Sequence, residues 1–290
     1  MTVDQRRALV TQYLKKKQVA LSWLLNAVGL SRNAWYYQPK TDPTKDTSIV
    51  KEIKTVLTVS PYYGYRRVTA ELKRQGQVYN HKRIIRIMGE NHLIQIRRKR
   101  TVPKTTNSNH QYVVYANEIK LLTNLTPATV WVSDITYIPV GNTWCYAAIV
   151  LDQCTREVVG WSLASHMRTS LCIEALEMAL STHRAPQFHH SDRGSQYCSH
   201  AYQNKLQDHH ITPSMADVGV SVDNPYAESF NRSLKVEEVY LNHYDTISDA
   251  RASLATYLAC YNSTRLHSSL GYIPPMEFAA NYYQTEVSKN

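Results

Sequence analysis

The sequence predicts two structural classes in one chain: helical modules at the N-terminal side, followed by an α/β domain. Charge is divided unevenly, since residues 1–110 hold 22 Lys and Arg against 6 Asp and Glu, whereas residues 111–290 hold 11 against 17. Apolar residues recur with helical spacing up to about residue 96, and from Val130 they alternate as in strands. The basic part is therefore expected to meet a polyanion such as DNA, and the acidic part to contain the main core.

The composition excludes several classes of protein. Hydrophobic residues make up 43% of the chain, which is enough for a buried core and argues against general disorder. The longest apolar run, from Cys145 to Leu151, is too short to span a bilayer, and the charged N-terminus lacks a secretory apolar segment. The five cysteines form no CxxC pair, which predicts reduced thiols in a cytosolic protein.

Residues 1–45 are predicted to form a helix-turn-helix-like segment. Apolar residues from Leu21 to Leu30 give a helical stripe, Gly29 interrupts it, and Ser31 can cap a second helix that passes Trp35. An ordinary helical hairpin is the alternative, because short helical pairs are common.

Residues 46–96 are predicted to form a second helix-turn-helix, the DNA-binding domain. Pro61 and Gly64 separate its first two helices, Gly76 ends the second, and Asn80 can cap a basic third. A basic helix after a tight turn suits the DNA major groove, although a solvated basic face would look the same. The buried side of this third helix is assigned to Ile84, Ile85, Ile87 and Met88. The candidate DNA contacts are Arg66, Arg67, Lys82, Arg83 and Arg86.

Residues 97–129 are expected to be a basic, extended linker. It begins with the block from Arg97 to Arg100, and no periodic pattern follows.

Residues 130–290 are predicted to be the α/β domain, with a helical tail at its C-terminal end. Strands are expected at 130–140, 143–152 and 156–164, followed by a helix at 169–183 and a short strand at 187–192. A helix at 197–209, a strand at 211–215 and helices at 225–240 and 248–261 complete the pattern. Three strands in a meander followed by alternating helices and strands is the order of an RNase H-like domain.

Three acidic residues in this domain form a candidate site. Asp134 lies in the middle of a strand, where an unpaired buried carboxylate is costly. Asp192 follows a short strand, at the sheet edge where ligands bind in α/β folds. Glu228 lies on a helix, with Asn224, Arg232 and Lys235 expected on the same face. Such carboxylates can bind two Mg²⁺ ions beside a phosphate.

Each of these acids is a weak signal alone, and rivals exist. Asp152 is interpreted as a turn residue and Asp223 as a helix N-cap. Glu237 and Glu238 lie further along the helix that carries Glu228. Spacing separates the sets, because 35 residues lie between Asp192 and Glu228.

That spacing, with five stretches in order, resembles the DDE transposases of the IS-three insertion-sequence family, in their second-reading-frame product. The stretches are WVSDITYI, GWS, HHSDRGSQY, DNPYAESFNRSLKVE and YNSTRLHSSLGYIPPMEF, and YGYRRVTAELKRQGQVYNHKRIIRIM is similar to that family's integrase-associated helix-turn-helix. The likeness covers nearly the whole chain. One departure is Asn231, at a position where an aromatic is common, which we expect to affect helix packing more than chemistry.

The resemblance implies a retroviral integrase-type RNase H-like core and a bacterial, cytoplasmic protein that associates with the nucleoid through DNA. It implies Asp134, Asp192 and Glu228 as catalytic metal ligands for two Mg²⁺ ions, with Mn²⁺ able to substitute. Its implied partners are double-stranded DNA (terminal inverted repeats and target), further copies of the chain, and an upstream-frame protein or fusion. The DNA contacts expected near the carboxylates are Arg193, Arg232 and Lys235, and the candidate supporting residues are Asn224, His190, Arg265 and His267.

The predicted function is therefore metal-dependent cleavage and strand transfer of insertion-sequence ends. Two alternatives stay open: a DNA-binding regulator on a non-catalytic integrase-like scaffold, and an RNase H-like nuclease. A structural zinc site at the His189-His190 and His209-His210 pairs is disfavoured because no paired cysteines accompany them. A serine hydrolase is disfavoured because no GxSxG elbow is present.

Overall fold

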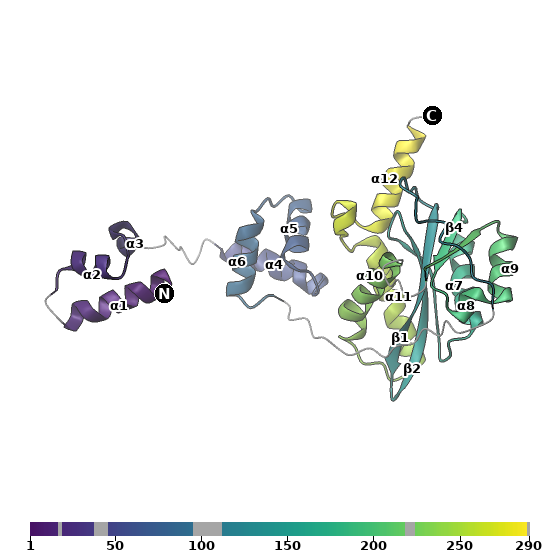
Figure 1. Cartoon of the computed structure of the whole chain (residues 1–290), viewed down its shortest axis with the longest axis horizontal. Coiled ribbons are helices and arrows are strands. Elements are labelled where there is room, and N and C mark those ends of the chain that lie inside the picture. Colours follow the sequence, from purple (N-terminus) through teal and green to yellow (C-terminus); the bar gives the residue numbers. More distant parts are fainter. Residues whose placement is uncertain (17–18, 38–45, 95–111, 218–223, 289–290) are drawn as a thin grey trace. The chain divides into compact units, whose positions relative to one another are not determined.

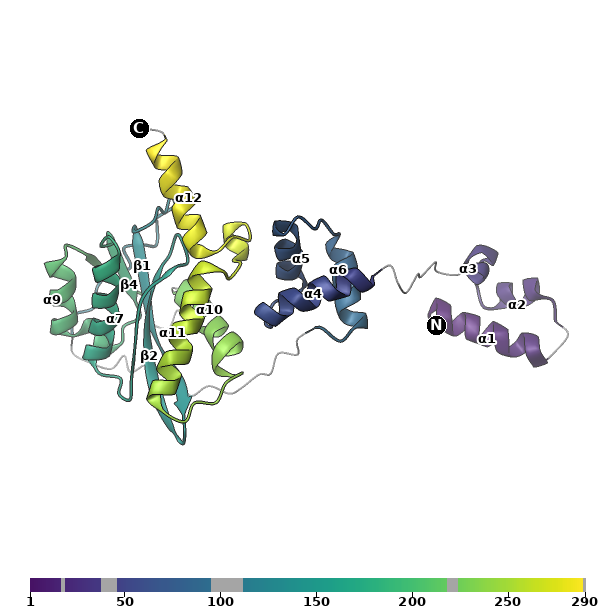
Figure 2. The same ribbon diagram turned by 180° about the vertical axis from the view of Figure 1, so that it is seen from behind.

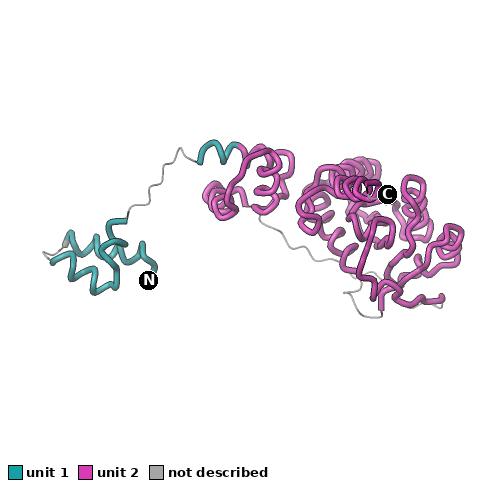
Figure 3. The backbone as a smooth tube through the Cα atoms, turned by 90° about the horizontal axis from the view of Figure 1, so that it is seen from above, with its two compact units in different colours: residues 1–51 teal, residues 52–290 magenta. Residues whose placement is uncertain are grey.

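The computed structural model describes residues 1–16, 19–37, 46–94, 112–217 and 224–288. The chain divides into two compact units, residues 1–51 and residues 52–290, which have different colours in Figure 3. None of the helices in the described ranges has the length and apolarity needed to cross a membrane.

The first unit contains three short helices and the first residues of a fourth. The three short helices are α1 (Val3–Lys16), α2 (Leu21–Ala27) and α3 (Arg32–Tyr36). Val10 of α1 is buried with Leu24, Leu25 and Leu30, so α1, which no sequence pattern had singled out, completes this small core. Gly29 has a φ of 63° and ends α2, and the Ser31 side chain accepts a hydrogen bond from the backbone of α3, as predicted.

Three further helices form the helix-turn-helix module. They are α4 (Thr47–Val59), α5 (Tyr65–Arg74) and α6 (His81–Glu90). Asn80 caps α6 by accepting a hydrogen bond from the Lys82 amide at 2.9 Å. Ile84, Ile87 and Met88 are buried as predicted, but Ile85 is 39% exposed. The prediction for Ile85 was wrong because one residue along a helix turns the side chain by about 100°.

A five-stranded mixed sheet forms the centre of the α/β domain, in the order β3-β2-β1-β4-β5 (Figure 1). Its strands are β1 (Val130–Val140), β2 (Thr143–Asp152), β3 (Val158–Ala164), β4 (Phe188–Ser191) and β5 (Thr212–Met215). The first three form an antiparallel meander, and β4 and β5 add in parallel to β1. The meander of the first three strands was predicted, and the two short strands follow at the predicted places in the chain.

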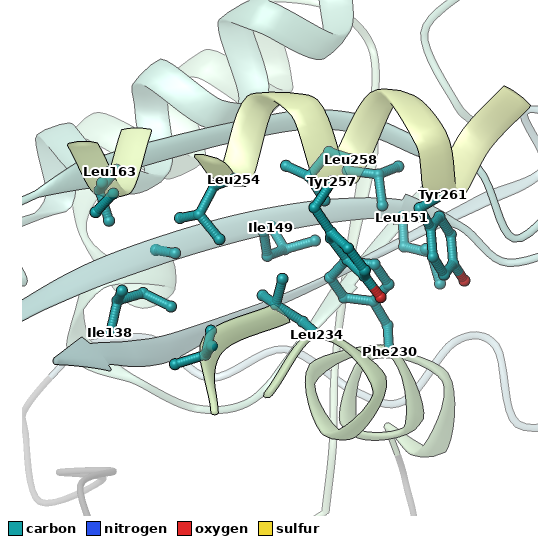
Figure 4. Packing of buried hydrophobic residues seen from close by; sticks show 14 of the residues in the cluster. Ile138, Ile149, Leu151, Leu163, Phe230, Leu234, Leu254, Tyr257, Leu258 and Tyr261 are labelled. Carbon is teal, nitrogen blue, oxygen red and sulfur yellow. The ribbon is translucent and has the colours of Figure 1, made fainter. Parts of the chain in front are cut away.

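Helices cover both faces of the sheet (Figures 1 and 2). One face packs against α10 (Pro225–Leu234) and α11 (Ile247–Ser263), and Figure 4 shows Phe230, Leu234 and Leu254 inserted between them and the strands. The other face packs against α7 (Thr169–Thr182), α8 (Ser195–Cys198) and α9 (His200–Asp208). Gly160 allows α7 to approach β3, since a Cβ there would lie 2.2 Å from a backbone oxygen of α7.

Two helical turns and a last helix complete the domain. A π-helical turn, η2 (Lys235–Val239), follows α10 directly, and a short helix, η3 (Ser268–Leu270), precedes α12 (Pro275–Val287). The single helix predicted at 225–240 is thus an α-helix that changes to a π-turn at Lys235. Single π-turns of this kind are frequent at functional sites.

Part of the predicted linker belongs to the domain. Residues 95–111, including the basic block, lie outside the described residues, but residues 112–129 pack against the domain. Ile119 and Leu125 contact the core on the α10 and α11 face, and the Glu118 amide donates to Ser214 Oγ at 3.0 Å. The expectation of an extended linker is therefore wrong for this half, because Ile119 and Leu125 are partly buried against the core although no periodic pattern marks them.

Candidate active site

Asp134 and Asp192 lie at the same level on neighbouring strands. β1 and β4 are parallel, and Val132 pairs with His190, so each aspartate follows two residues beyond a paired position. Asp134 is in the middle of β1, and Asp192 comes directly after β4. The Gly194 amide donates to Asp192 Oδ1 at 3.0 Å and fixes the turn that follows the strand.

α10 brings Glu228 to these aspartates. Asn224, the residue before the helix, donates from Nδ2 to the Ser133 carbonyl at 3.0 Å, and Asn231 donates from Nδ2 to Asp134 Oδ2 at 2.8 Å. Two hydrogen bonds, about two helical turns apart, therefore hold α10 to β1 at Ser133 and at Asp134. Glu228 lies between these anchors in sequence, on the exposed side of the helix.

The electrostatics of Asp134 show that the three carboxylates interact. Burial raises the pKa of Asp134 to about 7, and the charge of Asp192 and, more weakly, that of Glu228 act in the same direction. Hydrogen bonds from the Ile135 amide and from Asn231 oppose this rise. The site thus concentrates negative charge that its own hydrogen bonds only partly offset.

The donor chemistry fits a hard divalent cation. Carboxylate and amide oxygens are its preferred ligands, and a cation would relieve the repulsion that raises the pKa of Asp134. Asn224 Oδ1 is buried and has no hydrogen-bond partner among the described residues, so it is a further oxygen near the carboxylates. As the side chains stand, no three His, Cys, Asp or Glu in the described ranges are grouped closely enough to hold an ion.

The basic residues near the carboxylates differ in their surroundings. Lys235 is half-buried at the start of η2, with its Nζ 5.8 Å from the Tyr137 ring centre, and burial lowers its pKa while the charge of Asp134 acts against that change. Arg232 is exposed. Arg193 donates from Nε to the Ala216 carbonyl at 2.6 Å, so it ties the turn after β4 to the segment after β5.

Asn224 precedes the helix and is directed at β1, whereas Glu228 and Arg232 are exposed. One expectation about α10 needs correction. Asn231, expected to affect helix packing more than chemistry, is a direct partner of Asp134. From the sequence, Asn231 could be placed on the helix, but its hydrogen bond to Asp134 is visible only in the tertiary structure.

A second acidic cluster lies a short way along the same helical segment. Glu237 is buried, and its two carboxylate oxygens accept from Arg265 Nε and Nη2, both at 2.6 Å. Tyr257 OH donates to Glu237 Oε2 at 3.0 Å, and Arg67 Nη1 lies 3.6 Å from Oε1. Burial alone would lower the pKa of Arg265, but its hydrogen bonds to Glu237 raise it overall. Sequence reasoning had treated Glu237 only as a rival acid.

This Glu237 cluster changes the interpretation of two arginines. Arg265, named as a candidate supporting residue, is 2% exposed and ion-paired with Glu237, so it supports the core. Arg67, expected to contact DNA, faces Glu237 and the Tyr63 ring instead. Tyr63 OH also accepts from the Leu266 amide at 2.8 Å, so α5 and its preceding turn contact the segment that follows α11.

The remaining candidates on the helix-turn-helix are partly or fully accessible. Lys82 is exposed, Arg83 lies 6.0 Å from the Tyr79 ring centre, and Arg86 pairs with Glu90 at 2.7 Å on the helix surface. Arg66 is exposed, with its guanidinium 5.3 Å from the Tyr65 ring centre.

The two candidate histidines, His190 and His267, are hydrogen-bonded to serine side chains. His190 is buried, and its Nδ1 is hydrogen-bonded to Ser214 Oγ at 2.9 Å, which links β4 to β5. Burial, with a smaller effect from Arg265, lowers the pKa of His267 to about 3, and its Nδ1 is hydrogen-bonded to Ser269.

Asp152 is the turn residue that the sequence predicted. Its Oδ1 accepts from the Cys154 and Thr155 amides at 2.9 and 2.8 Å, and its Oδ2 accepts from the Ala128 amide at 2.7 Å. Asp223 lies outside the described residues.

Comparison with known proteins identifies the family. Residues 125–221 and 209–275 match models of the integrase core domain, and residues 44–101 match an HTH-like domain. The chain is 34% identical over 265 residues to the "Insertion element IS600 uncharacterized 31 kDa protein" of Shigella sonnei, covering 88% of the chain and 97% of that protein. It is 35% identical over 227 residues to the transposase InsF for insertion sequence IS3A of Escherichia coli (strain K12), covering 74% of the chain and 76% of InsF. The chain belongs to the IS3 family of insertion-sequence transposases.

This membership confirms the predicted fold class, an RNase H-like integrase core preceded by a helix-turn-helix domain. Among solved structures, the magnesium complex of the HTLV-2 integrase catalytic core (trimeric form) is similar to 54% of this transposase-family chain and 99% of its own length. Its TM-score is 0.44 at 15% identity.

Proposed function

We propose that the chain cleaves and joins insertion-sequence ends at an active site formed by Asp134, Asp192 and Glu228. The observation that carries this proposal is the raised pKa of Asp134, to which the charges of Asp192 and Glu228 contribute. The pairing of β1 with β4 and the hydrogen bond from Asn231 of α10 to Asp134 support it. The reaction class, DNA cleavage and joining, is proposed because the chain matches the integrase core domain and is similar to a transposase.

The three carboxylates would hold Mg²⁺, with Mn²⁺ as a substitute and two ions per site. When bound, such ions activate the attacking oxygen and stabilise the leaving oxygen of a phosphodiester. The residues of the chain supply the positioning: Asn231 holds Asp134 Oδ2, and Asn224 fixes α10 against β1. Lys235, near Asp134, supplies positive charge for a DNA phosphate.

We further propose that double-stranded DNA, both the terminal inverted repeats and the target, is the partner. Residues 46–96 would bind the ends through Arg66, Lys82, Arg83 and Arg86, with residues 1–45 as an additional module and residues 97–129 connecting them to the core at 130–290. Arg193 and Arg232 are proposed contacts near the carboxylates. Joining two ends calls for more than one copy of the chain, and an upstream-frame protein or fusion would strengthen end binding.

A strand-transfer assay tests this proposal. The substrate is a labelled duplex bearing the terminal repeat that flanks the gene of the chain, with Mg²⁺ or Mn²⁺. Asp134→Asn, Asp192→Asn and Glu228→Gln are each expected to reduce joining by roughly a hundredfold or more, because each removes a metal ligand. DNA binding by the same variants, measured by gel shift, is expected to change little.

Asp208→Asn is the matched control, because Asp208 lies at the end of α9 on the other side of the sheet. If the wild type joins DNA ends and all three variants still do so, the carboxylate site is excluded. Binding without joining by wild type would favour the DNA-binding regulator, and cutting without joining would favour the nuclease.

A further inference from the structure

Three aromatic side chains form a platform on the β1–β2 hairpin. Tyr137 of β1 pairs across the strands with Tyr146 of β2, and Trp144 lies two residues before Tyr146, on the same side of β2. The Tyr137 ring centre is 5.4 Å from that of Tyr146 and 6.1 Å from that of Trp144, both edge-on. We call these three residues the aromatic platform.

The platform is accessible at one end and supported at the other. Trp144 is 47% exposed, whereas Tyr146 is partly buried against the core on the α7 and α9 face. Tyr137 OH is shielded from solvent and has no hydrogen-bond partner among the described residues. Because Trp144 meets Tyr137 edge-on and stays half exposed, part of the Trp144 ring is accessible to another planar group.

The platform adjoins the proposed active site. Tyr137 is three residues after Asp134 on β1, so the two side chains leave opposite faces of the sheet. Lys235 connects the two, because its Nζ lies 5.8 Å from the Tyr137 ring centre and the charge of Asp134 acts on its pKa. A cation that can bind a DNA phosphate therefore lies beside the rings and near Asp134.

We propose that the aromatic platform stacks an unpaired base at the DNA end whose phosphate occupies the carboxylate site, with Trp144 as the main stacking residue. This inference rests on the proposed function. Aromatic rings next to a cation suit a nucleotide, because its flat base can stack on the rings while the negative phosphate of its backbone contacts the cation. Opening the terminal pair costs free energy, and stacking on Trp144 would offset part of it.

Binding of a short duplex labelled with the fluorescent base aminopurine at its terminal position tests the platform. Two probes share the same labelled strand. In one the opposite strand is fully complementary, and in the other it is mismatched at the last positions. The full chain is used in chelating buffer, so that no DNA is cut. Wild type is expected to quench aminopurine and to bind the mispaired probe roughly tenfold more tightly than the paired one. Trp144→Leu, which keeps apolar bulk but has no ring, is expected to lose both the quench and the preference.

Two variants serve as matched controls. Trp144→Phe keeps a ring and is expected to retain most of the preference, which separates stacking from general damage to the hairpin. Tyr283→Ala removes an equally accessible aromatic, 52% exposed on α12, and is expected to behave as wild type. An unchanged preference in Trp144→Leu, or an equal loss in Tyr283→Ala, overturns the proposal.

Two further measurements separate the remaining outcomes. Asp134→Asn is expected to quench aminopurine as wild type does while it loses strand joining. If the proposed function is wrong, the joining assay fails and the quench is unaffected. If the platform is wrong, the quench fails and the joining assay is unaffected. Sedimentation without DNA addresses a contact between copies of the chain. If Trp144→Leu changes the oligomeric state and wild type shows no quench, the surface binds another copy rather than a base.

Discussion

Two groups of acidic residues, the set formed by Asp134, Asp192 and Glu228 (the Asp134 cluster) and the Glu237 cluster, differ in their surroundings. At the Asp134 cluster, three carboxylates come from separate elements, and the cation beside Asp134, Lys235, is half-buried. At the Glu237 cluster, one carboxylate is enclosed by Arg265, Tyr257 and Arg67. Removing one partner of a buried ion pair is costly, whereas like charges held close together are typical of sites that bind a ligand. The comparison assigns a structural role to Glu237 and supports the catalytic role proposed for the Asp134 cluster.

The largest stability effect is expected at the Glu237 cluster. Arg265→Ala leaves a buried carboxylate without its bidentate partner and is expected to destabilise the chain by roughly 3–5 kcal/mol. Urea unfolding measures this change. Arg184→Ala, at an exposed arginine of the same domain, is the control and is expected to stay within about 0.5 kcal/mol of wild type. Equal effects from the two substitutions would show that Glu237 does not depend on Arg265.

The Asp134 cluster is expected to respond in the opposite direction. The folded chain takes up a proton at Asp134 near pH 7, whereas the unfolded chain does so near the ordinary value of 3.8. Charged Asp134 therefore lowers stability above pH 7, and this cost is lost as the pH falls from 7 toward 3.8. In chelating buffer, Asp134→Asn should be more stable than wild type above pH 7, and the difference should shrink as the pH falls. A difference that does not vary with pH would contradict the raised pKa.

Adding metal should reverse that ranking. Mg²⁺ that binds only the folded state raises stability by about 2.7 kcal/mol when its concentration is a hundred times its dissociation constant. Thermal unfolding above pH 7 should therefore show a higher midpoint for wild type with Mg²⁺ and little change for Asp134→Asn. A similar rise in both would place the ion elsewhere.

The smallest effect is expected at Lys235, between the two clusters in sequence. Lys235→Ala should weaken DNA binding and reduce the slope of log affinity against log salt by about 1, because one phosphate contact is lost. Lys205→Ala is the control, since Lys205 pairs with Glu177 at 2.6 Å on the other face of the sheet. A salt slope that Lys235→Ala leaves unchanged would remove this residue from the DNA-facing surface.

Local signals in the sequence were sufficient for the element order and for the helix caps. Ser31 and Asn80 cap helices as predicted, because capping depends on a side chain and amides within three residues. Asp152 was assigned correctly to a turn for the same reason. The alternating pattern from Val130 determined the strand meander, since side chains alternate between the two faces of a strand. The spacing of Asp134, Asp192 and Glu228 also marked them as candidates before any contact was known.

Only the tertiary structure decided which distant side chains meet. Asn231 contacts Asp134 across 97 positions of sequence, and Arg265 contacts Glu237 across 28, and no periodicity encodes such pairs. The segment 112–129 and the exposed Ile85 were misjudged because burial depends on what packs against a residue, and hydrophobicity alone does not report this. The sequence determines which groups are available, and the free energy of burying them against particular neighbours determines which become a site and which become a core.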